Sequence, residues 1–151
     1  MRALYVWLSR LIALAVVLQV LFIAWSAFDI AKNAGDGIPF TEDTEQNIGQ
    51  ALHLYVGMMA MPVLALLFAI VSFFAKVRGG AALAWVTLGL VVLQIALAYA
   101  SFAAPVVGML HALNAFAIAA VAGVAGSRAT KSGAAPAAPV ASGGPGVPAG
   151  A

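Results

Sequence analysis

Four apolar stretches, each about as long as a bilayer-crossing helix, occupy most of this 151-residue chain. A helix needs about 20 predominantly apolar residues to cross the hydrocarbon core of a membrane. Only 8% of the residues are charged and 64% are hydrophobic, whereas soluble domains carry about 25% charged residues. We therefore expect an all-α integral membrane protein with helices at about residues 5–28, 49–75, 81–104 and 106–126.

The composition also excludes several kinds of site. Cysteine is absent, which rules out disulfides, iron–sulfur clusters, thiolate zinc sites and covalent c-type haem. The pI is near 9.3, but the net charge is only +2 and no basic patch alternates with aromatic residues, so we expect no nucleic-acid binding. No set of catalytic residues is recognisable. The sequence thus favours a binding protein over an enzyme acting by itself.

The distribution of charge predicts how the chain crosses the membrane. All five acidic residues fall between the first two apolar stretches, accompanied only by Lys32. The other basic residues flank the opposite ends of the stretches: Arg2, Arg10, Lys76, Arg78, Arg128 and Lys131. Lys and Arg mark the cytoplasmic side. We expect an antiparallel four-helix bundle in the plasma membrane, with both termini cytoplasmic and residues 127–151 forming a disordered Ala/Pro/Gly-rich tail.

A weak internal repeat relates the two halves of the chain. VVLQ occurs in the first and third apolar stretches, and LH followed by small or apolar residues occurs in the second and fourth. The matched polar residues are Gln19 with Gln94, Ser26 with Ser101, and His53 with His111. A tandem repeat of two helical hairpins preserves membrane orientation, so its halves are related by an axis along the membrane normal. The two histidines are then expected to face each other.

Two facing histidines in an apolar bundle predict a cofactor site. We expect His53 and His111 to be the metal ligands of one haem b in the outer half of the bundle. Gly49 and Gly57, at i−4 and i+4 of His53, and Gly108, at i−3 of His111, lie on the same helix faces as the histidines and leave room for a flat macrocycle. A ligating histidine usually donates its second ring N–H to a neighbouring group. Backbone carbonyls can accept it, and so can the intramembrane polar side chains of Gln19, Gln94, Ser26 and Ser101. Asn114 can bond a neighbouring helix or the edge of the haem.

The same residues also fit a structure without a cofactor. Small residues allow close helix packing, and His, Gln and Asn form hydrogen bonds between membrane helices; for Asn114 this packing role is the favoured one. In that interpretation the protein is a non-catalytic accessory or assembly subunit of a larger membrane complex, such as a respiratory complex. Zinc would need more protein ligands, and a proton pathway would need an acidic residue within a span. Pro62 predicts a kink in the second helix.

The residues LHALNAF at 110–116, with His53 early in the second helix, resemble an uncharacterised family of small four-span bacterial membrane proteins over roughly residues 1–128. More distantly, the arrangement is similar to one four-helix half of haem A synthase and to di-histidine b-type membrane cytochromes. With both axial positions filled by protein, haem iron would have no open site for oxygen, so we expect electron transfer to a quinone or respiratory partner, or haem handling. The resemblance itself implies only His53 and His111 as axial ligands. It does not extend to haem oxidation, because no acidic residue lies within a span.

Overall fold

The computed structural model describes residues 1–41 and 43–132, and the regular elements in this part of the chain are all helical. The elements are α1 (Arg2–Gly35), α2 (Ile48–Tyr55), a π-helical turn (Val56–Ala60), α3 (Met61–Ser72), α4 (Gly80–Ala103), a 3₁₀ turn (Pro105–Val107) and α5 (Gly108–Lys131). Four continuous helical segments are long and apolar enough to cross a membrane, the second of them running from α2 through the π turn to α3. The predicted all-helical class with four such segments is confirmed.

Two helices run beyond their predicted ends. α1 continues to Gly35 rather than ending near residue 28, and an exposed i,i+4 ion pair of 2.6 Å between Lys32 and Asp36 spans its C-terminal end. α5 continues to Lys131, so the first residues of the predicted tail are helical, and residues 133–151 lie outside the described part. Near Pro62 the helix contains a π turn, Val56–Ala60, which is one of the local features at which helices bend.

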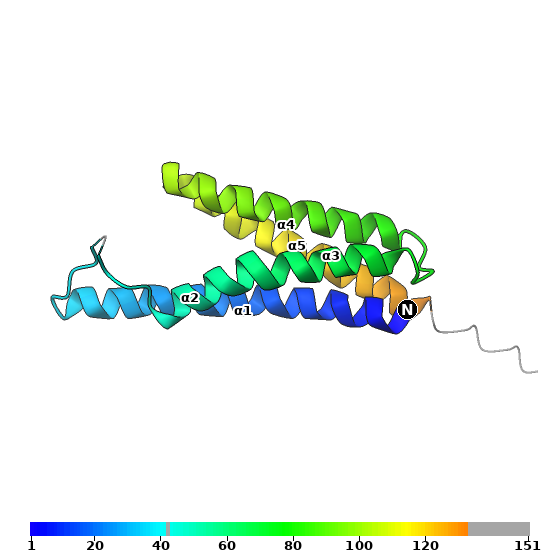
Figure 1. Cartoon of the computed structure of the whole chain (residues 1–151), viewed down its shortest axis with the longest axis horizontal. Coiled ribbons are helices and arrows are strands. Elements are labelled where there is room, and N and C mark those ends of the chain that lie inside the picture. The colour runs from blue at the N-terminus through cyan, green and yellow to red at the C-terminus, as the bar shows by residue number, and fades with distance from the viewer. Residues whose placement is uncertain (42, 133–151) are drawn as a thin grey trace, which may run out of the picture.

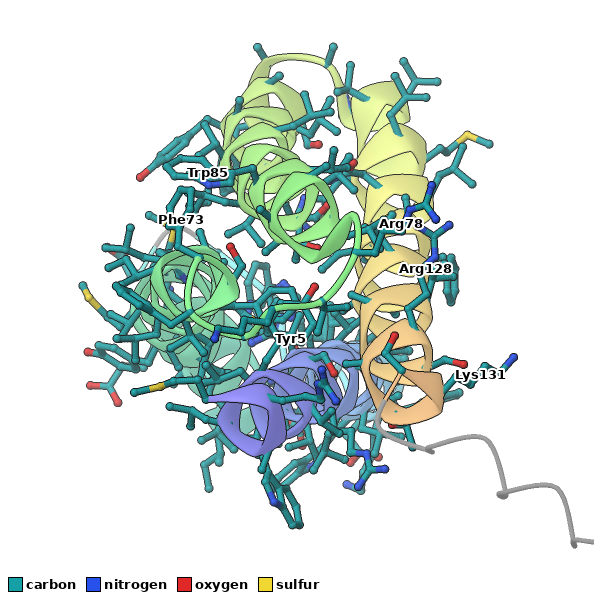
Figure 2. All side chains as sticks on the ribbon, turned by 90° about the vertical axis from the view of Figure 1, so that its right-hand side faces the viewer. Tyr5, Phe73, Arg78, Trp85, Arg128 and Lys131 are labelled. Atoms are coloured by element: carbon teal, nitrogen blue, oxygen red, sulfur yellow. The ribbon has the colours of Figure 1, made fainter. Side chains whose placement is uncertain are left out.

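The helices pack side by side, with α1 against α5 and against α2 and α3, and with α4 against α3 and α5 (Figure 1). One end of the molecule carries the start of α1, the α3–α4 loop and the end of α5. The Arg2 guanidinium joins these segments by donating to the carbonyls of Ser132, at 3.2 Å, and Lys76, at 3.4 Å. Arg78 and Arg128 also lie at this end (Figure 2), which we call the basic end.

The buried core is concentrated toward the basic end. The fully buried Tyr5 ring packs on Phe68, with ring centres 4.5 Å apart, and its hydroxyl donates to the Gly80 carbonyl at 2.8 Å. Further core residues follow along α1, α3, α4 and α5: Leu8, Ile12, Val16, Ala65, Ala84, Val91, Ile118, Ala122 and Ala125. Toward the opposite end α4 and α5 diverge from α1 and α2 (Figure 1). No residue in 17–25, 50–60 or 92–113 is fully buried.

Close packing at that opposite end is confined to the start of α2. A Cβ placed on Gly49 would lie 2.6 Å from the Phe22 carbonyl oxygen and 2.8 Å from the Ser26 nitrogen, so only glycine allows α2 to approach α1 here. Asn47 and Gln50 form a capping box that begins α2. The Asn47 amide also donates to the Ser26 carbonyl at 3.3 Å, which ties the start of α2 to α1.

Candidate functional site

The structure brings the rings of His53 and His111 together from helices far apart in the sequence. His53 is on α2 and His111 is on α5, and both side chains are half-buried. Their ring centres are 6.3 Å apart and their planes are inclined by 58°. Aromatic rings in contact have centres about 4.5–7 Å apart, and inclined pairs are common among them. The two imidazoles are therefore in an inclined rather than a face-to-face arrangement.

Each histidine is held by the backbone of the glutamine that the sequence repeat assigns to it. His53 Nδ1 lies 3.1 Å from the Gln19 carbonyl oxygen, and His111 Nδ1 lies 3.0 Å from the Gln94 carbonyl oxygen. A carbonyl oxygen can only accept a hydrogen bond, so Nδ1 is the protonated nitrogen in both rings. The two helix pairs, α1 with α2 and α4 with α5, thus build the same histidine–carbonyl contact.

This hydrogen bond fixes the tautomer of both imidazoles. When Nδ1 of a neutral imidazole carries the proton, Nε2 presents a lone pair. A carbonyl on Nδ1–H is a frequent outer partner of metal-ligating histidines, and it orients the ring and raises the basicity of the ligating nitrogen. Both rings are thus prepared to act as ligands through Nε2.

The polar side chains next to the histidines differ between the two helix pairs. The buried Asn114 amide donates to the Leu90 carbonyl at 2.9 Å and to Gln94 Oε1 at 2.7 Å. Asn114 therefore joins α5 to α4. In the first pair, Gln19 Nε2 is buried and has no hydrogen-bond partner within the described chain. A buried unpaired donor costs about 1–3 kcal/mol, so this amide is suited to meet an additional acceptor.

The other predicted site residues have more local roles. A Cβ on Gly57 would stand 3.6 Å from Gln19 Oε1, and a Cβ on Gly108 would stand 3.7 Å from Ser101 Oγ. Both are ordinary van der Waals distances, so a Cβ would fit at either position and neither glycine is sterically required. Ser101 donates to the Leu97 carbonyl of its own helix at 2.7 Å. Gly49, which the sequence placed beside the histidine, serves the packing of α2 on α1 instead.

Protein side chains alone do not assemble a larger metal site in the described residues, where no three His, Cys, Asp or Glu side chains come together. Two hollows elsewhere on the molecule are not lined by either histidine. One lies beside the α1–α2 loop around Asn33 and Phe40. The other is between the start of α1 and the end of α5, around Arg2, Trp7 and Arg10. The histidine pair is the described group best suited to ligation.

No known family model matches this sequence, and no curated protein or solved structure is significantly similar to it.

Proposed function

We propose that this protein is a membrane cytochrome-like protein that binds one haem b between His53 and His111. The helices form an antiparallel four-helix bundle in the plasma membrane, with both termini on the cytoplasmic side and the histidines in the outer half. The observation that carries the proposal is the matched pair of imidazoles, each with Nδ1 on a backbone carbonyl and with ring centres 6.3 Å apart.

The spacing of the rings fits coordination to one metal from opposite sides. Imidazole–metal bonds in proteins are about 2.0–2.1 Å long, and the ring centre lies a little over 1 Å behind the ligating nitrogen, so two opposed imidazoles have centres about 6 Å apart. The observed separation is 6.3 Å. The ring planes can rotate about the metal–nitrogen bonds, so an inclination of 58° is compatible with this arrangement.

The surroundings of the pair suit a flat apolar group. At the level of the histidines, within 17–25, 50–60 and 92–113, the protein buries no residue fully. An apolar macrocycle between the helix pairs would fill this thinly packed level with van der Waals contacts, which drive packing inside a bilayer. The unpaired Gln19 Nε2 supplies a hydrogen-bond donor toward this level. A porphyrin also brings its own four nitrogen ligands, which explains why two protein ligands suffice.

The residues of the chain determine what such a site does. The Gln19 and Gln94 carbonyls orient the two rings through Nδ1, and the two histidines would hold the haem iron. A haem with two protein ligands supplies one-electron transfer and has no open position for oxygen. We therefore assign the protein to electron transfer or haem handling, with a quinone or a respiratory-complex subunit as its partner.

The outer surface provides little positive charge for haem propionates. Lys32 is the only basic residue between the first two spans, and it is paired with Asp36. It is also 13 residues beyond Gln19 in α1, or about 20 Å along the helix axis. The propionates would instead meet water and uncharged donors such as the exposed Tyr55 hydroxyl.

A second candidate is a cofactor-free accessory or assembly subunit of a larger membrane complex. It is favoured by the fact that the two Nδ1 bonds join neighbouring helices, as hydrogen bonds that serve only packing would. This alternative expects a colourless protein, and it expects histidine substitutions to lower stability without changing any visible spectrum.

Absorption spectroscopy distinguishes the two candidates. We expect the protein, expressed with ample haem and purified in detergent, to show a Soret band and, after dithionite reduction, sharp α and β bands of a low-spin haem. Pyridine haemochrome analysis should give one haem per chain. Colourless protein under these conditions would refute the haem proposal.

Substitutions then test the ligands. His53→Ala and His111→Ala should each abolish the low-spin spectrum, and added imidazole should restore it in part. Leu54→Ala and Leu113→Ala are matched controls, because these exposed residues lie close to the histidines in sequence and should leave the spectrum unchanged. Unaltered spectra in both histidine variants would show that other residues bind the haem.

A further inference from the structure

The buried faces of the first helix of each pair coincide when the two are aligned on their glutamines. In α4 the four buried residues lie 14, 10, 7 and 3 positions before Gln94: Gly80, Ala84, Thr87 and Val91. Buried residues of α1 lie at the same four distances before Gln19: Tyr5, Ser9, Ile12 and Val16. The repeat suggested by a few polar residues therefore extends through the packing of both helices, with no offset.

The second helices of the two pairs are α5 and the continuous segment that runs from α2 through the π turn into α3. Their buried residues also match when the two are aligned on their histidines, apart from a shift of one residue. In α5, buried residues lie 7, 11, 14, 15 and 18 positions after His111: Ile118, Ala122, Ala125, Gly126 and Ala129. In α3 the five buried residues lie 8, 12, 15, 16 and 19 positions after His53: Met61, Ala65, Phe68, Ala69 and Ser72. Every distance in the first pair is longer by one. One extra residue therefore lies between His53 and Met61.

The π turn at Val56–Ala60 occupies this interval. In a π turn the backbone N–H bonds to the carbonyl five residues earlier, and here Met61 N–H donates to the Val56 carbonyl. Pro62 gives the reason for the position, because it has no N–H for the Met58 carbonyl and its ring would clash with that carbonyl in a regular α-helix. The wider turn accommodates the proline and takes up one residue.

We propose that the π turn is a one-residue insertion that keeps His53 on the buried face of its helix, aimed at His111. In a regular α-helix with about 100° per residue, the eight positions from His53 to Met61 would set the histidine about 80° away from the core face. If the π turn takes up one residue, seven positions remain between His53 and Met61, and the histidine lies about 20° from the core face, on the other side. His111, seven positions before Ile118, has that same offset without a π turn.

The inference deepens the proposed function, because it identifies what positions one of the two ligands, but the register it describes does not depend on haem. Deletion of Met59, combined with Pro62→Ala, should convert the segment into continuous α-helix and leave His53 facing His111. Deletion of Phe116 is the matched control. Met59 is 65% exposed and Phe116 is 62% exposed, but the second helix pair has no π turn to absorb the loss.

The readout uses the absence of native cysteine. His53→Cys and His111→Cys are introduced together, the membranes are treated with a short bis-maleimide, and the bridged product is measured by mass spectrometry. We expect the Met59 deletion with Pro62→Ala to give a bridging yield within about twofold of the full-length double-cysteine protein. We expect the Phe116 deletion to lower that yield at least tenfold, because the deletion rotates the thiol at position 111 by about 100°, to about 120° from the core face of its helix.

Every other combination of results overturns the proposal. Loss of bridging in the Met59 deletion, whether by rotation or by misfolding, would show that the turn does not contain a spare residue. Retained bridging in the Phe116 deletion would show that helix register does not control which way the site residues face. A colourless protein with the expected bridging pattern would refute the haem proposal alone and leave the register inference standing.

Discussion

Gly49→Ala is the substitution for which the structure gives the clearest energetic expectation. The added Cβ would lie 2.6 Å from the Phe22 carbonyl oxygen and 2.8 Å from the Ser26 nitrogen, both of them backbone atoms of α1. Ordinary van der Waals contact for a Cβ begins at about 3.4 Å, so α2 must move away from α1 by about 0.8 Å. Neither neighbour is a flexible side chain that can turn aside.

The expected cost combines two opposing contributions. Overpacking of this kind destabilises by about 1–3 kcal/mol, and replacing a helical glycine by alanine returns about 0.5–1 kcal/mol. We expect a net loss of about 1–2 kcal/mol. Gly49 is one turn before His53, where the Nδ1 to Gln19 carbonyl distance is 3.1 Å, so the same displacement would lengthen this bond to about 3.9 Å, beyond hydrogen-bonding range.

The assay is reversible unfolding by SDS in mixed detergent micelles, followed by far-UV circular dichroism. Gly89→Ala is the control, because its Cβ would meet no atom within 4 Å and should leave stability equal or slightly higher. Gly49→Ala should unfold at a lower SDS fraction than both the unmodified protein and this control. Equal midpoints for the two alanine variants would refute the argument that α2 and α1 are in backbone contact at Gly49.

Three further substitutions are expected to lower the free energy of unfolding by different amounts in the same assay. Tyr5→Phe removes a buried hydroxyl that donates to the Gly80 carbonyl and should cost about 1–2 kcal/mol; a neutral result would mean that water replaces the lost donor. Asn114→Leu removes the bond to Gln94 Oε1 and should cost about 1 kcal/mol, in the range measured for hydrogen bonds between membrane helices, unless the leucine gains equal packing. Lys32→Ala breaks only an exposed ion pair and should change stability by less than about 0.5 kcal/mol, so a larger loss would indicate that α1 needs this pair to extend beyond the bilayer.

The number of spans was predictable from the sequence, because bilayer thickness sets the length of an apolar helix. The ends of α1 and α5 were not predictable from the same principle. Outside the bilayer a helix end depends on local bonds, such as the Lys32–Asp36 pair, and these are weak signals in a sequence. The mean hydropathy that defines a span decreases several residues before the helix itself ends.

The histidine pair and its matched glutamines were also visible in the sequence, because polar residues stand out against Val, Leu and Ala. The atom that accepts from each histidine was not determined there. The acceptor is a backbone carbonyl, and since every residue carries one, no residue type signals it. The glutamine side chains instead act in other ways, with Gln94 accepting from Asn114.

The π turn and the role of Gly49 could not be predicted from the sequence, for a different reason. Residues 54–60 are apolar or small throughout, so no contrast between polar and apolar positions marks the residue at which the register changes. Gly49 was placed beside His53 from its i−4 spacing. That spacing identifies a shared helix face, but it does not tell which neighbouring helix approaches most closely.

The uneven burial along the helices has a consequence for how the molecule moves. Tyr5 and Phe68 lock the basic end, whereas α2 and the first turns of α5 contain Gly49 as their only fully buried residue before Asn114. Segments with few buried contacts open locally at a lower free-energy cost than the core. The two helix pairs should therefore separate transiently at the end opposite the basic end, while the basic end stays packed. Amide exchange should be faster in residues 50–60 than in 61–72. A flat hydrophobic molecule could then enter sideways from the lipid while the core stays folded.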